Sequence, residues 1–287
     1  MKRVVLAILL SSLLSMVLCQ AGPSRGTIKF KGQEREYWIS VPEGASQSTP
    51  LVICLHGYGG KAEGYKPGFE KKALERGFAV CFPQGLKAPK GKTGWNVRYP
   101  KQEGMTSDDI AFVVFLSKQL PKQFGLSQKN VFMTGMSNGG EMCYLMAYKC
   151  PRAFRAIASV AGLQMGWIKD ELKPKGPVPF FEIHGTEDKT SRWEGDPDNQ
   201  YGWGEYLPVP AAVANMVSIN DCRLYSKTEL PAFPDTDKRV ILHSYTRGAE
   251  NTEVAFYEVV GGTHSWADDA VDTYGIILDF FSRHFAK

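Results

Sequence analysis

The sequence lacks the features that mark several special classes of protein. Charge of one sign is not in excess: 34 basic and 30 acidic residues give a formal net charge of +4, so neither nucleic acid nor an anionic membrane is expected as a partner. No CxxC or HxxxH spacing occurs, which argues against a metal site built from Cys and His. The 29 glycines and 17 prolines follow no period, which excludes a collagen-like repeat. What remains is an ordinary globular composition, with 43% hydrophobic residues in 287.

The cysteines are too few and too irregularly spaced to define a disulfide framework. Five of the six lie beyond the N-terminal segment, so at most two disulfides can form and one thiol stays free. Cys143 and Cys150 are seven residues apart on a predicted helix, a rise of about 10 Å, which is too far for a bond to each other. The pairing stays open among Cys54, Cys81, Cys143, Cys150 and Cys222.

The N-terminal segment has the pattern of a cleaved signal peptide. Lys2 and Arg3 precede the apolar run Val4–Leu18, whose 15 residues are too few for a membrane span. A small-x-small cleavage site begins at Cys19, so residues 1–21 are predicted to be removed. Loss of Lys2 and Arg3 lowers the formal charge from +4 to +2. Lipidation at Cys19 is the alternative reading, and both readings make the protein secreted or periplasmic.

From residue 22 onward, short apolar runs alternate with amphipathic segments. Strands are predicted at 27–40 (a hairpin), 50–55, 78–82, 130–134, 179–183 and 252–260. Helices are predicted at 66–76, from a cap at Thr106 or Ser107 to about 124, from about 138, at 209–220 and at 271–284. This alternation predicts an α/β fold with a mainly parallel central sheet covered by helices on both faces. No repeat or linker divides residues 22–287, so one domain is expected.

One motif stands where a strand is followed directly by a helix. Gly135-Met136-Ser137-Asn138-Gly139 has the form G-x-S-x-G, which in this context presents a serine hydroxyl on a strained turn. The two glycines are expected because larger side chains would collide where the strand and the helix approach each other. A bystander serine in a glycine-rich turn is the alternative, and the residues that could activate Ser137 decide between them.

A serine nucleophile needs a base and an acid that orients the base. His184-Gly185-Thr186-Glu187-Asp188 and Gly261-Gly262-Thr263-His264 each follow a predicted strand, and open α/β sheets place their ligands at the carboxyl ends of strands. Asp188 is therefore the candidate acid and His264 the candidate base. The acids that compete with Asp188 are Glu187, Asp196, Asp268 and Asp269.

Acyl transfer also needs N–H donors for the developing oxyanion. The backbone N–H of Asn138, which follows the nucleophile, is one candidate. The second is expected from the loop after an early strand, where Leu55-His56-Gly57-Tyr58-Gly59-Gly60 stands. The N–H of Tyr58 is the candidate there.

These motifs together resemble the polyhydroxybutyrate depolymerase-like esterases, which include the family-1 carbohydrate esterases (feruloyl and acetylxylan esterases). The resemblance rests on His56-Gly57-x-Gly59-Gly60, Gly135-x-Ser137-Asn138-Gly139-Gly140, His184-Gly185-Thr186-x-Asp188 and Gly261-Gly262-x-His264-x-Trp266, and it runs from about residue 35 onward. It implies an α/β-hydrolase fold with Ser137, Asp188 and His264 as the triad, and no cofactor or metal.

The resemblance also suggests which aromatic residues border the substrate. It points to Trp95 and Trp266 at the acyl or sugar site, and to Trp193 and Trp203 in a loop suited to sugar recognition, with packing in the core as the alternative for each. Tyr58 stands where relatives often carry Cys, so the family's disulfides cannot be transferred.

The expected function is removal of feruloyl or acetyl groups from xylan-type plant polysaccharides by an exported serine esterase, with no obligate protein partner. A polyhydroxyalkanoate depolymerase or a general short-chain esterase is the alternative. The sequence shows no appended binding domain, which favours a soluble or side-chain ester over a polyester. A non-catalytic binding protein with an esterase shell is the remote alternative.

A dinucleotide enzyme is the rival from another class. Residues 57–62 fit G-x-G-x-x-A after a strand, but that reading expects an acid at the end of the next strand, where Pro83 and Gln84 stand instead. Gly91-Lys92-Thr93 lacks the first glycine of a phosphate loop, with Leu86 in its place.

Overall fold

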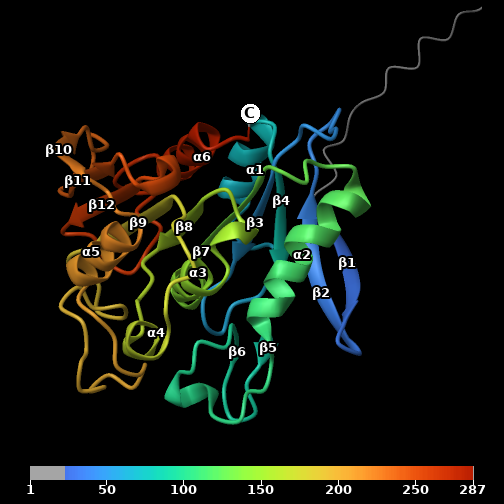
Figure 1. Ribbon diagram of the computed structural model, residues 1–287, viewed down its shortest axis with the longest axis horizontal. Coiled ribbons are helices and arrows are strands. Elements are labelled where there is room, and N and C mark those ends of the chain that lie inside the picture. Colours follow the sequence, from blue (N-terminus) through green and yellow to red (C-terminus); the bar gives the residue numbers. More distant parts are fainter. Residues whose placement is uncertain (1–22, 287) are drawn as a thin grey trace, which may run out of the picture.

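The computed structural model describes residues 23–286, so the predicted signal peptide and Cys19 lie outside the described residues. Its centre is a ten-stranded sheet with the strand order β1-β2-β4-β3-β7-β8-β9-β12-β11-β10 (Figure 1). The strands are β1 Ser24–Phe30, β2 Gln33–Ser40, β3 Leu51–Leu55, β4 Ala79–Pro83, β7 Val131–Met136, β8 Ile157–Val160, β9 Phe180–Gly185, β10 Leu224–Leu230, β11 Arg239–Thr246 and β12 Val254–Val260.

The middle of the sheet is parallel and its edges are antiparallel. Strands β4, β3, β7, β8, β9 and β12 pair in parallel with their neighbours. At one edge β2 pairs antiparallel with β4 and with β1, and at the other β11 pairs antiparallel with β12 and with β10. The prediction of a mainly parallel central sheet is therefore confirmed. The carboxyl ends of the six parallel strands lie side by side along the edge of the sheet that runs across the strands.

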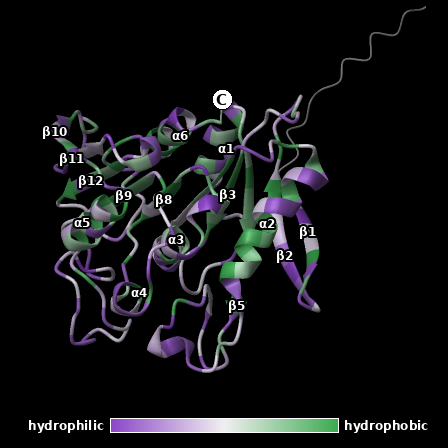
Figure 2. Ribbon diagram, viewed as in Figure 1, coloured by the Kyte–Doolittle hydropathy of each residue, from purple (hydrophilic) through white to green (hydrophobic). Residues whose placement is uncertain are grey.

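The helices cover both faces of this sheet, and strand β3 shows the division residue by residue. Leu51, Ile53 and Leu55 face a core built with helices α2, α3 and α5, whereas Val52 and Cys54 face a second core built with α1 and α6. Because alternate side chains of a strand point to opposite faces, a continuous apolar run buries both. Figure 2 shows the central strands in hydrophobic green and the loops below them largely in purple and white. The helices are α1 Pro67–Glu75, α2 Asp109–Phe124, α3 Asn138–Lys149, α4 Gly166–Glu171, α5 Val209–Ile219 and α6 Thr273–Arg283.

The ends of the helices follow local chemistry, with one correction to the predicted caps. Gly77 and Gly125 follow α1 and α2 with φ of +75° and +64°, the left-handed conformation that glycine adopts at helix ends. Helix α2 is capped by Asp108, whose carboxylate accepts the N–H of Ala111. The expected cap at Thr106 or Ser107 is wrong, because only the side chain of residue 108 reaches a free N–H of the first turn.

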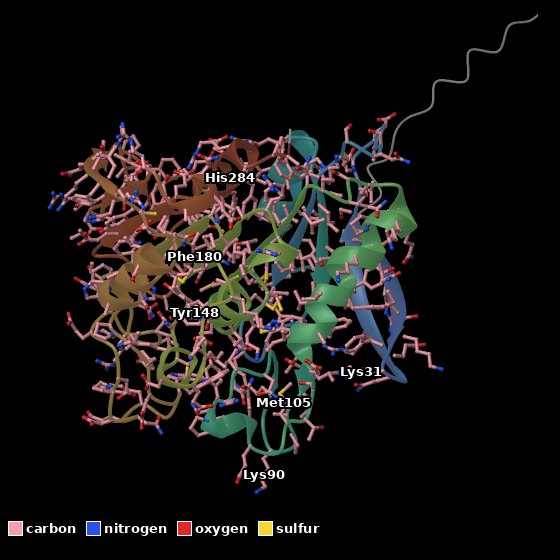
Figure 3. The ribbon with its side chains drawn as sticks, in the orientation of Figure 1. Lys31, Lys90, Met105, Tyr148, Phe180 and His284 are labelled. Carbon is pink, nitrogen blue, oxygen red and sulfur yellow. The ribbon has the colours of Figure 1, made fainter. Side chains whose placement is uncertain are left out.

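A small lobe projects from the edge of the sheet where the parallel strands end. It contains the two-residue strands β5 Leu86–Lys87 and β6 Thr93–Gly94 and lies at the bottom of Figure 1. In Figure 3, Lys90 points outward at the tip of this lobe. The backbone of Thr93 accepts a hydrogen bond from the N–H of Gly59 at 2.7 Å, which ties the lobe to the loop after β3.

The described cysteines form no disulfide with one another. Cys54, Cys81 and Cys143 are buried as free thiols, and Cys150 and Cys222 are partly buried and also free. The sequence allowed for up to two disulfides, and none forms among the described residues. Between residues 23 and 286, no helix has both the length and the apolar character needed to cross a membrane.

Candidate active site

Ser137 stands on a tight turn between β7 and α3. Its backbone has φ of +55° and ψ of −122°, a conformation that a non-glycine residue adopts only when its surroundings impose it. A Cβ at Gly139 would lie 2.4 Å from the carbonyl oxygen of Leu55, and one at Gly135 would lie 2.6 Å from the Gly139 backbone. The two glycines of the motif are therefore required by the approach of strand to helix, and the turn holds Ser137 at the edge of the sheet.

Asp188 and His264 form the pair that the sequence predicts to act together. Nδ1 of His264 lies 2.7 Å from Oδ2 of Asp188. The other carboxylate oxygen of Asp188 accepts the N–H groups of Thr190 and Ser191, each at 2.8 Å. Asp188 is buried and His264 is partly exposed. Because a carboxylate only accepts, Nδ1 carries the proton, and Nε2 is left as the nitrogen that can exchange a proton with substrate groups.

The three candidate residues come from strands that lie close together in the sheet. Ser137 follows β7, Asp188 follows β9 and His264 follows β12, and the order in this region is β7-β8-β9-β12. Asp188 and His264 are in direct contact, whereas no hydrogen bond joins the Ser137 hydroxyl to His264 within the described chain. Hydrogen bonds of this kind commonly tighten only when a substrate is bound. The positions of the three residues therefore suit acyl transfer, with the hydrogen bond between Ser137 and His264 still to form.

The two candidate oxyanion donors lie beside Ser137. Asn138 opens helix α3, where the first N–H groups have no partner within the helix. The loop after β3 approaches from the other side, since a Cβ at Gly57 would lie 3.4 Å from the Cβ of Ser137. The next residue is Tyr58, whose N–H donates to no acceptor among residues 23–286. Both N–H groups are thus available next to the candidate nucleophile.

Two buried side chains behind this loop hold it in place. Trp95 donates its backbone N–H to Oδ1 of Asn138 at 2.6 Å and accepts from the Asn138 amide at 3.0 Å. Nε2 of His56 accepts the N–H of Gly85 at 3.0 Å, and Nδ1 lies 2.8 Å from the Gly57 carbonyl. This arrangement requires a neutral imidazole with its proton on Nδ1, and burial lowers the pKa of His56 accordingly.

The four tryptophans predicted to border the substrate divide between the core and the surface. Trp95 is 0% exposed and Trp266 is 1% exposed. Trp95 donates its indole N–H to the His56 carbonyl, and Trp266 packs against Phe69. The expectation that Trp95 and Trp266 contact the substrate is wrong for this structure, because neither indole reaches the surface.

Trp193 and Trp203 are both partly exposed. Trp193 stacks on Phe256 with ring centroids 5.8 Å apart. Trp203 packs edge-to-face with Tyr58 at 5.8 Å and against Tyr99 at 5.2 Å. Trp203 therefore stands next to the loop that carries the candidate oxyanion donor.

A buried polar cluster behind Asp188 was not predicted. Nδ1 of His184 lies 3.0 Å from Glu182, and Nε2 lies 2.7 Å from the Ser191 carbonyl and 3.5 Å from Oδ2 of Asp188. The Ser191 N–H in turn binds Asp188, so His184 fixes the turn that holds the candidate acid. The signal in the sequence is the two-residue spacing of Glu182 and His184 in an otherwise apolar strand, which places both on one face.

The electrostatics of this cluster favour charge on the imidazole. Burial disfavours the charged form of His184, but the hydrogen bond and the charge of Glu182 outweigh it and raise the pKa of His184. Glu141, in the first turn of α3, is also buried. Burial, followed by the charges of Glu182 and Asp188, raises the pKa of Glu141 well above its ordinary value, which favours its protonated form.

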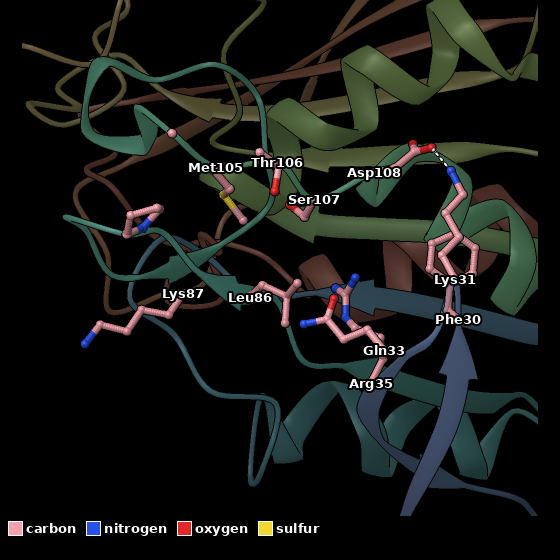
Figure 4. A pocket seen from close by; sticks show the side chains of 12 residues that line it. Phe30, Lys31, Gln33, Arg35, Leu86, Lys87, Met105, Thr106, Ser107 and Asp108 are labelled. Atoms are coloured by element: carbon pink, nitrogen blue, oxygen red, sulfur yellow. Dashed lines mark hydrogen bonds and ion pairs between the residues drawn. The ribbon is translucent and has the colours of Figure 1, made fainter.

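Two cavities lie near the small lobe. One of about 460 Å³ is bounded by Tyr58, Lys92, Lys101 and Trp203 among others. The other, of about 440 Å³, is shown in Figure 4; it lies between the β1–β2 hairpin and the lobe, with the Lys31–Asp108 ion pair at one side. None of the candidate triad residues lines the second cavity. Within the described chain, no three His, Cys, Asp or Glu side chains are grouped so that they could hold a metal ion.

Comparison with known proteins gives a match to one family model. The family model described as "Esterase PHB depolymerase" matches residues 36–173, which include the Tyr58 loop and the Ser137 turn. Over this segment the chain is similar to the polyhydroxybutyrate depolymerase-like esterases. Among curated relatives, the chain is 30% identical to feruloyl esterase C of Emericella nidulans over 172 residues, which are 56% of this chain and 57% of the relative.

Other relatives show the same pattern of partial coverage. The acetylxylan esterase of Coprinopsis cinerea is 30% identical over 55% of this chain and 42% of its own length, and the putative esterase NocK of Nocardia uniformis is 29% identical over 57% and 48%. The chain thus spans about half the length of these relatives. The solved structure of an acetyl xylan esterase from Aspergillus awamori superposes on this chain with a TM-score of 0.61 at 16% sequence identity. The superposition covers 90% of this chain and 99% of the solved one. This likeness confirms the α/β-hydrolase fold.

Proposed function

We propose that the protein is a serine carboxylic-ester hydrolase that removes feruloyl or acetyl groups from xylan-type plant polysaccharides. The observation that carries the proposal is the 2.7 Å contact between His264 and Asp188 at the sheet edge where a strained turn presents Ser137. A buried carboxylate that engages Nδ1 leaves Nε2 as a base, which is what a serine hydroxyl needs in order to react at neutral pH.

In the first half of the reaction, Nε2 of His264 takes the proton of Ser137 Oγ while that oxygen attacks the ester carbonyl. The tetrahedral oxyanion is held by the N–H groups of Tyr58 and Asn138. Asp188 orients the imidazole and stabilises the imidazolium that forms. The bond to the alcohol then breaks, His264 returns its proton to the leaving sugar oxygen, and the acyl group stays on Ser137.

In the second half, His264 takes a proton from water, and the hydroxide attacks the acyl carbonyl. The bond to Ser137 Oγ breaks, the serine recovers its proton from His264, and the carboxylic acid leaves. Activity should therefore fall toward acid pH, because an imidazolium cannot accept the Ser137 proton. A rate that stays flat between pH 4 and pH 8 (about the range in which histidine titrates) would contradict this assignment.

The polysaccharide substrate is proposed from the relatives and from the surface near Ser137. Two of the relatives are named as feruloyl and acetylxylan esterases, and the matching family model covers the segment that carries Tyr58 and Ser137. Partly exposed Trp203 beside Tyr58 offers an aromatic surface of the kind that sugars contact. We further propose export as the route by which the protein reaches such a polymer, on the strength of the signal-peptide pattern in residues 1–21.

The test is release of ferulate and of acetate from arabinoxylan by the purified protein, with Ser137→Ala as the matched variant. Ferulate released by the wild type alone supports a feruloyl esterase, and acetate alone supports an acetylxylan esterase. Hydrolysis of poly(3-hydroxybutyrate) in place of both would assign a polyester depolymerase. Failure of the wild type on these polymers and on a simple aryl acetate would overturn the catalytic proposal and leave a binding protein.

A further inference from the structure

A cavity with an unusual lining lies next to the Tyr58 loop. Its volume is about 460 Å³, and its walls come from the small lobe and from two aromatic residues. The lining residues are Tyr58, Lys90, Gly91, Lys92, Pro100, Lys101, Glu103 and Trp203. Three of these side chains are cationic and one is anionic, so the cavity is positively charged.

The cavity is continuous with the candidate oxyanion loop. The ring of Tyr58 forms part of its wall, while the residue before it, Gly57, lies against Ser137. A Cβ at Gly94 would lie 2.6 Å from the Asn138 side chain and 3.1 Å from the Tyr58 ring. Tyr58 therefore lines the cavity, while the residue before it in the chain contacts Ser137. A polymer cleaved at Ser137 could extend into the cavity.

The positive charge of the cavity belongs to the lobe and not to the protein as a whole. Residues 86–103 contain five basic side chains and one acidic one, although the complete chain of 287 residues has a formal net charge of only +4. Lys90 lies 3.8 Å from Glu103, and Arg98 pairs with Glu171. Lys92 and Lys101 have no carboxylate within 4 Å in the part of the chain that the structure describes. Two unneutralised ammonium groups thus line one cavity.

The two lysines are also placed by neighbouring groups. Nζ of Lys101 lies 3.6 Å from the centroid of the Trp203 ring, a cation–π contact. The backbone N–H of Lys92 donates to the Tyr58 hydroxyl at 3.0 Å, and its side-chain stem lies against Gly59, where a Cβ would meet it at 3.0 Å. Lys92 and Lys101 are therefore held on the aromatic wall, where a ligand that contacts the rings also meets the charges.

We propose that this cavity is a subsite for a carboxylate-bearing sugar, a hexuronate, in the polysaccharide whose ester is cleaved at Ser137. The carboxylate pairs with Lys92 and Lys101, and the apolar face of the sugar ring packs against Tyr58 and Trp203. The inference rests on the proposed esterase function of the neighbouring site. It narrows the substrate class from neutral to acidic polysaccharides, because the aromatic rings alone accept any sugar and only the ammonium groups select an anion.

The test measures binding of oligosaccharides that carry no ester, so it is independent of turnover. Tryptophan fluorescence of the full chain is titrated with glucuronosyl-xylotriose, with trigalacturonate and with neutral xylotriose. At least about tenfold tighter binding of one or both acidic ligands is expected, weakening severalfold as NaCl rises from about 0.05 to 0.5 M. The acidic ligand that binds more tightly identifies whether the hexuronate belongs to a branched xylan or to a galacturonan.

Matched variants separate the cavity from general charge. Lys92→Ala/Lys101→Ala should raise the dissociation constant for the acidic ligand about tenfold or more, and Lys92→Arg/Lys101→Arg should retain binding. Lys122→Ala/Lys129→Ala removes the same charge from exposed positions on and after α2 and should change nothing. Thermal melting checks that each variant is folded.

Three results would overturn the proposal. Equal affinity for acidic and neutral ligands would make the cavity a subsite for neutral sugars. If both double alanine variants weakened binding of the acidic ligand equally, Lys92 and Lys101 would act only through long-range electrostatic attraction and not through direct contact. Absence of binding by any ligand would remove the subsite altogether. Hydrolysis of an aryl acetate by the same protein preparation would show in each case that the proposed esterase function stands independently.

Discussion

Asp109→Asn is expected to destabilise the protein by about 3–5 kcal/mol, because it leaves a buried guanidinium without its counter-charge. Arg35 on β2 and Asp109 on α2 form an ion pair at 3.0 Å, with 2% and 0% of their side-chain surfaces exposed. The second oxygen of Asp109 accepts the N–H of Asn96 at 2.9 Å and the hydroxyl of Ser107 at 2.7 Å. Asparagine preserves the shape and one acceptor, but its amide NH₂ must face either the Arg35 guanidinium or the donors of Asn96 and Ser107. The substitution therefore removes the charge and one acceptor together.

The magnitude follows from the burial of Arg35. Its guanidinium lies 3.8 Å from the centroid of the Phe112 ring, and burial lowers the pKa of Arg35 against the opposing influence of Asp109. An exposed arginine would regain solvation when its partner is removed, but this side chain cannot do so without opening the packing between β2 and α2. A loss of about 3–5 kcal/mol corresponds to a melting temperature lower by about 6–20 °C in a protein of this size.

The assay is urea unfolding followed by tryptophan fluorescence, with Asp108→Asn as the control. Asp108 pairs with Lys31 at the surface and caps α2. Because asparagine caps as well as aspartate and exposed pairs contribute little, the control should lose less than about 1 kcal/mol. Arg35→Met/Asp109→Asn removes the unpaired charge and should be more stable than Asp109→Asn alone. The reasoning fails if Asp109→Asn costs less than about 1 kcal/mol or if the double variant is no better.

Asp188→Asn should lower kcat on an aryl acetate about 10⁴-fold with little change in KM, because His264 loses its orienting acceptor; a loss below about tenfold would exclude Asp188 as the acid. Gly139→Ala should cost about 1–3 kcal/mol or more in urea unfolding, because its Cβ would lie 2.4 Å from a backbone oxygen; near-wild-type stability would show that the turn can relax. Burial lowers the pKa of His56 below its ordinary value of 6.5. The neutral imidazole of His56 therefore stabilises the folded state above that pH, and this stabilisation is lost as the pH falls through the pKa that His56 has in the folded state. The stability advantage of the wild type over His56→Gln should therefore shrink between pH 7.5 and pH 5 (about the range of histidine titration), and an advantage that grows would reverse the assigned sign.

The centre of the fold could be predicted from the sequence because its strands are buried on both faces. The runs predicted at 50–55, 130–134 and 179–183 correspond to β3 Leu51–Leu55, β7 Val131–Met136 and β9 Phe180–Gly185. Continuous apolar runs of this kind have few alternative structures in a water-soluble domain. Ser137, Asp188 and His264 follow such strands, and this is why the sequence could place all three at one edge.

Strands β8 and β10 could not be predicted in the same way. β10 Leu224–Leu230 is exposed along nearly its whole length, so no hydrophobic pattern distinguishes it from a loop. β8 Ile157–Val160 is only four residues long. β8 depends on hydrogen bonds to β7 and β9, from which it is separated by other segments of the chain, and β10 depends on its pairing with β11. The local pattern of either strand does not contain that information.

The direction of individual side chains was also beyond the sequence. The family resemblance suggested Trp95 at the substrate site, with packing in the core as the alternative, and the structure buries it against Asn138 and His56. The path of the β5–β6 lobe decides this, and it is set by tertiary contacts such as the Gly59–Thr93 hydrogen bond. The positions of the candidate triad residues are therefore easier to predict than the orientation of the aromatic residues around them.

The most direct test of the proposed mechanism is covalent trapping of Ser137. The protein is treated with an activated phosphate triester such as diethyl p-nitrophenyl phosphate, digested and examined by mass spectrometry. We expect one diethylphosphoryl group per chain on the peptide that contains Ser137, in parallel with the loss of aryl acetate hydrolysis, and no label on Ser137→Ala. Label on a different serine, or full activity after Ser137 is labelled, would contradict the assignment of Ser137 as the nucleophile.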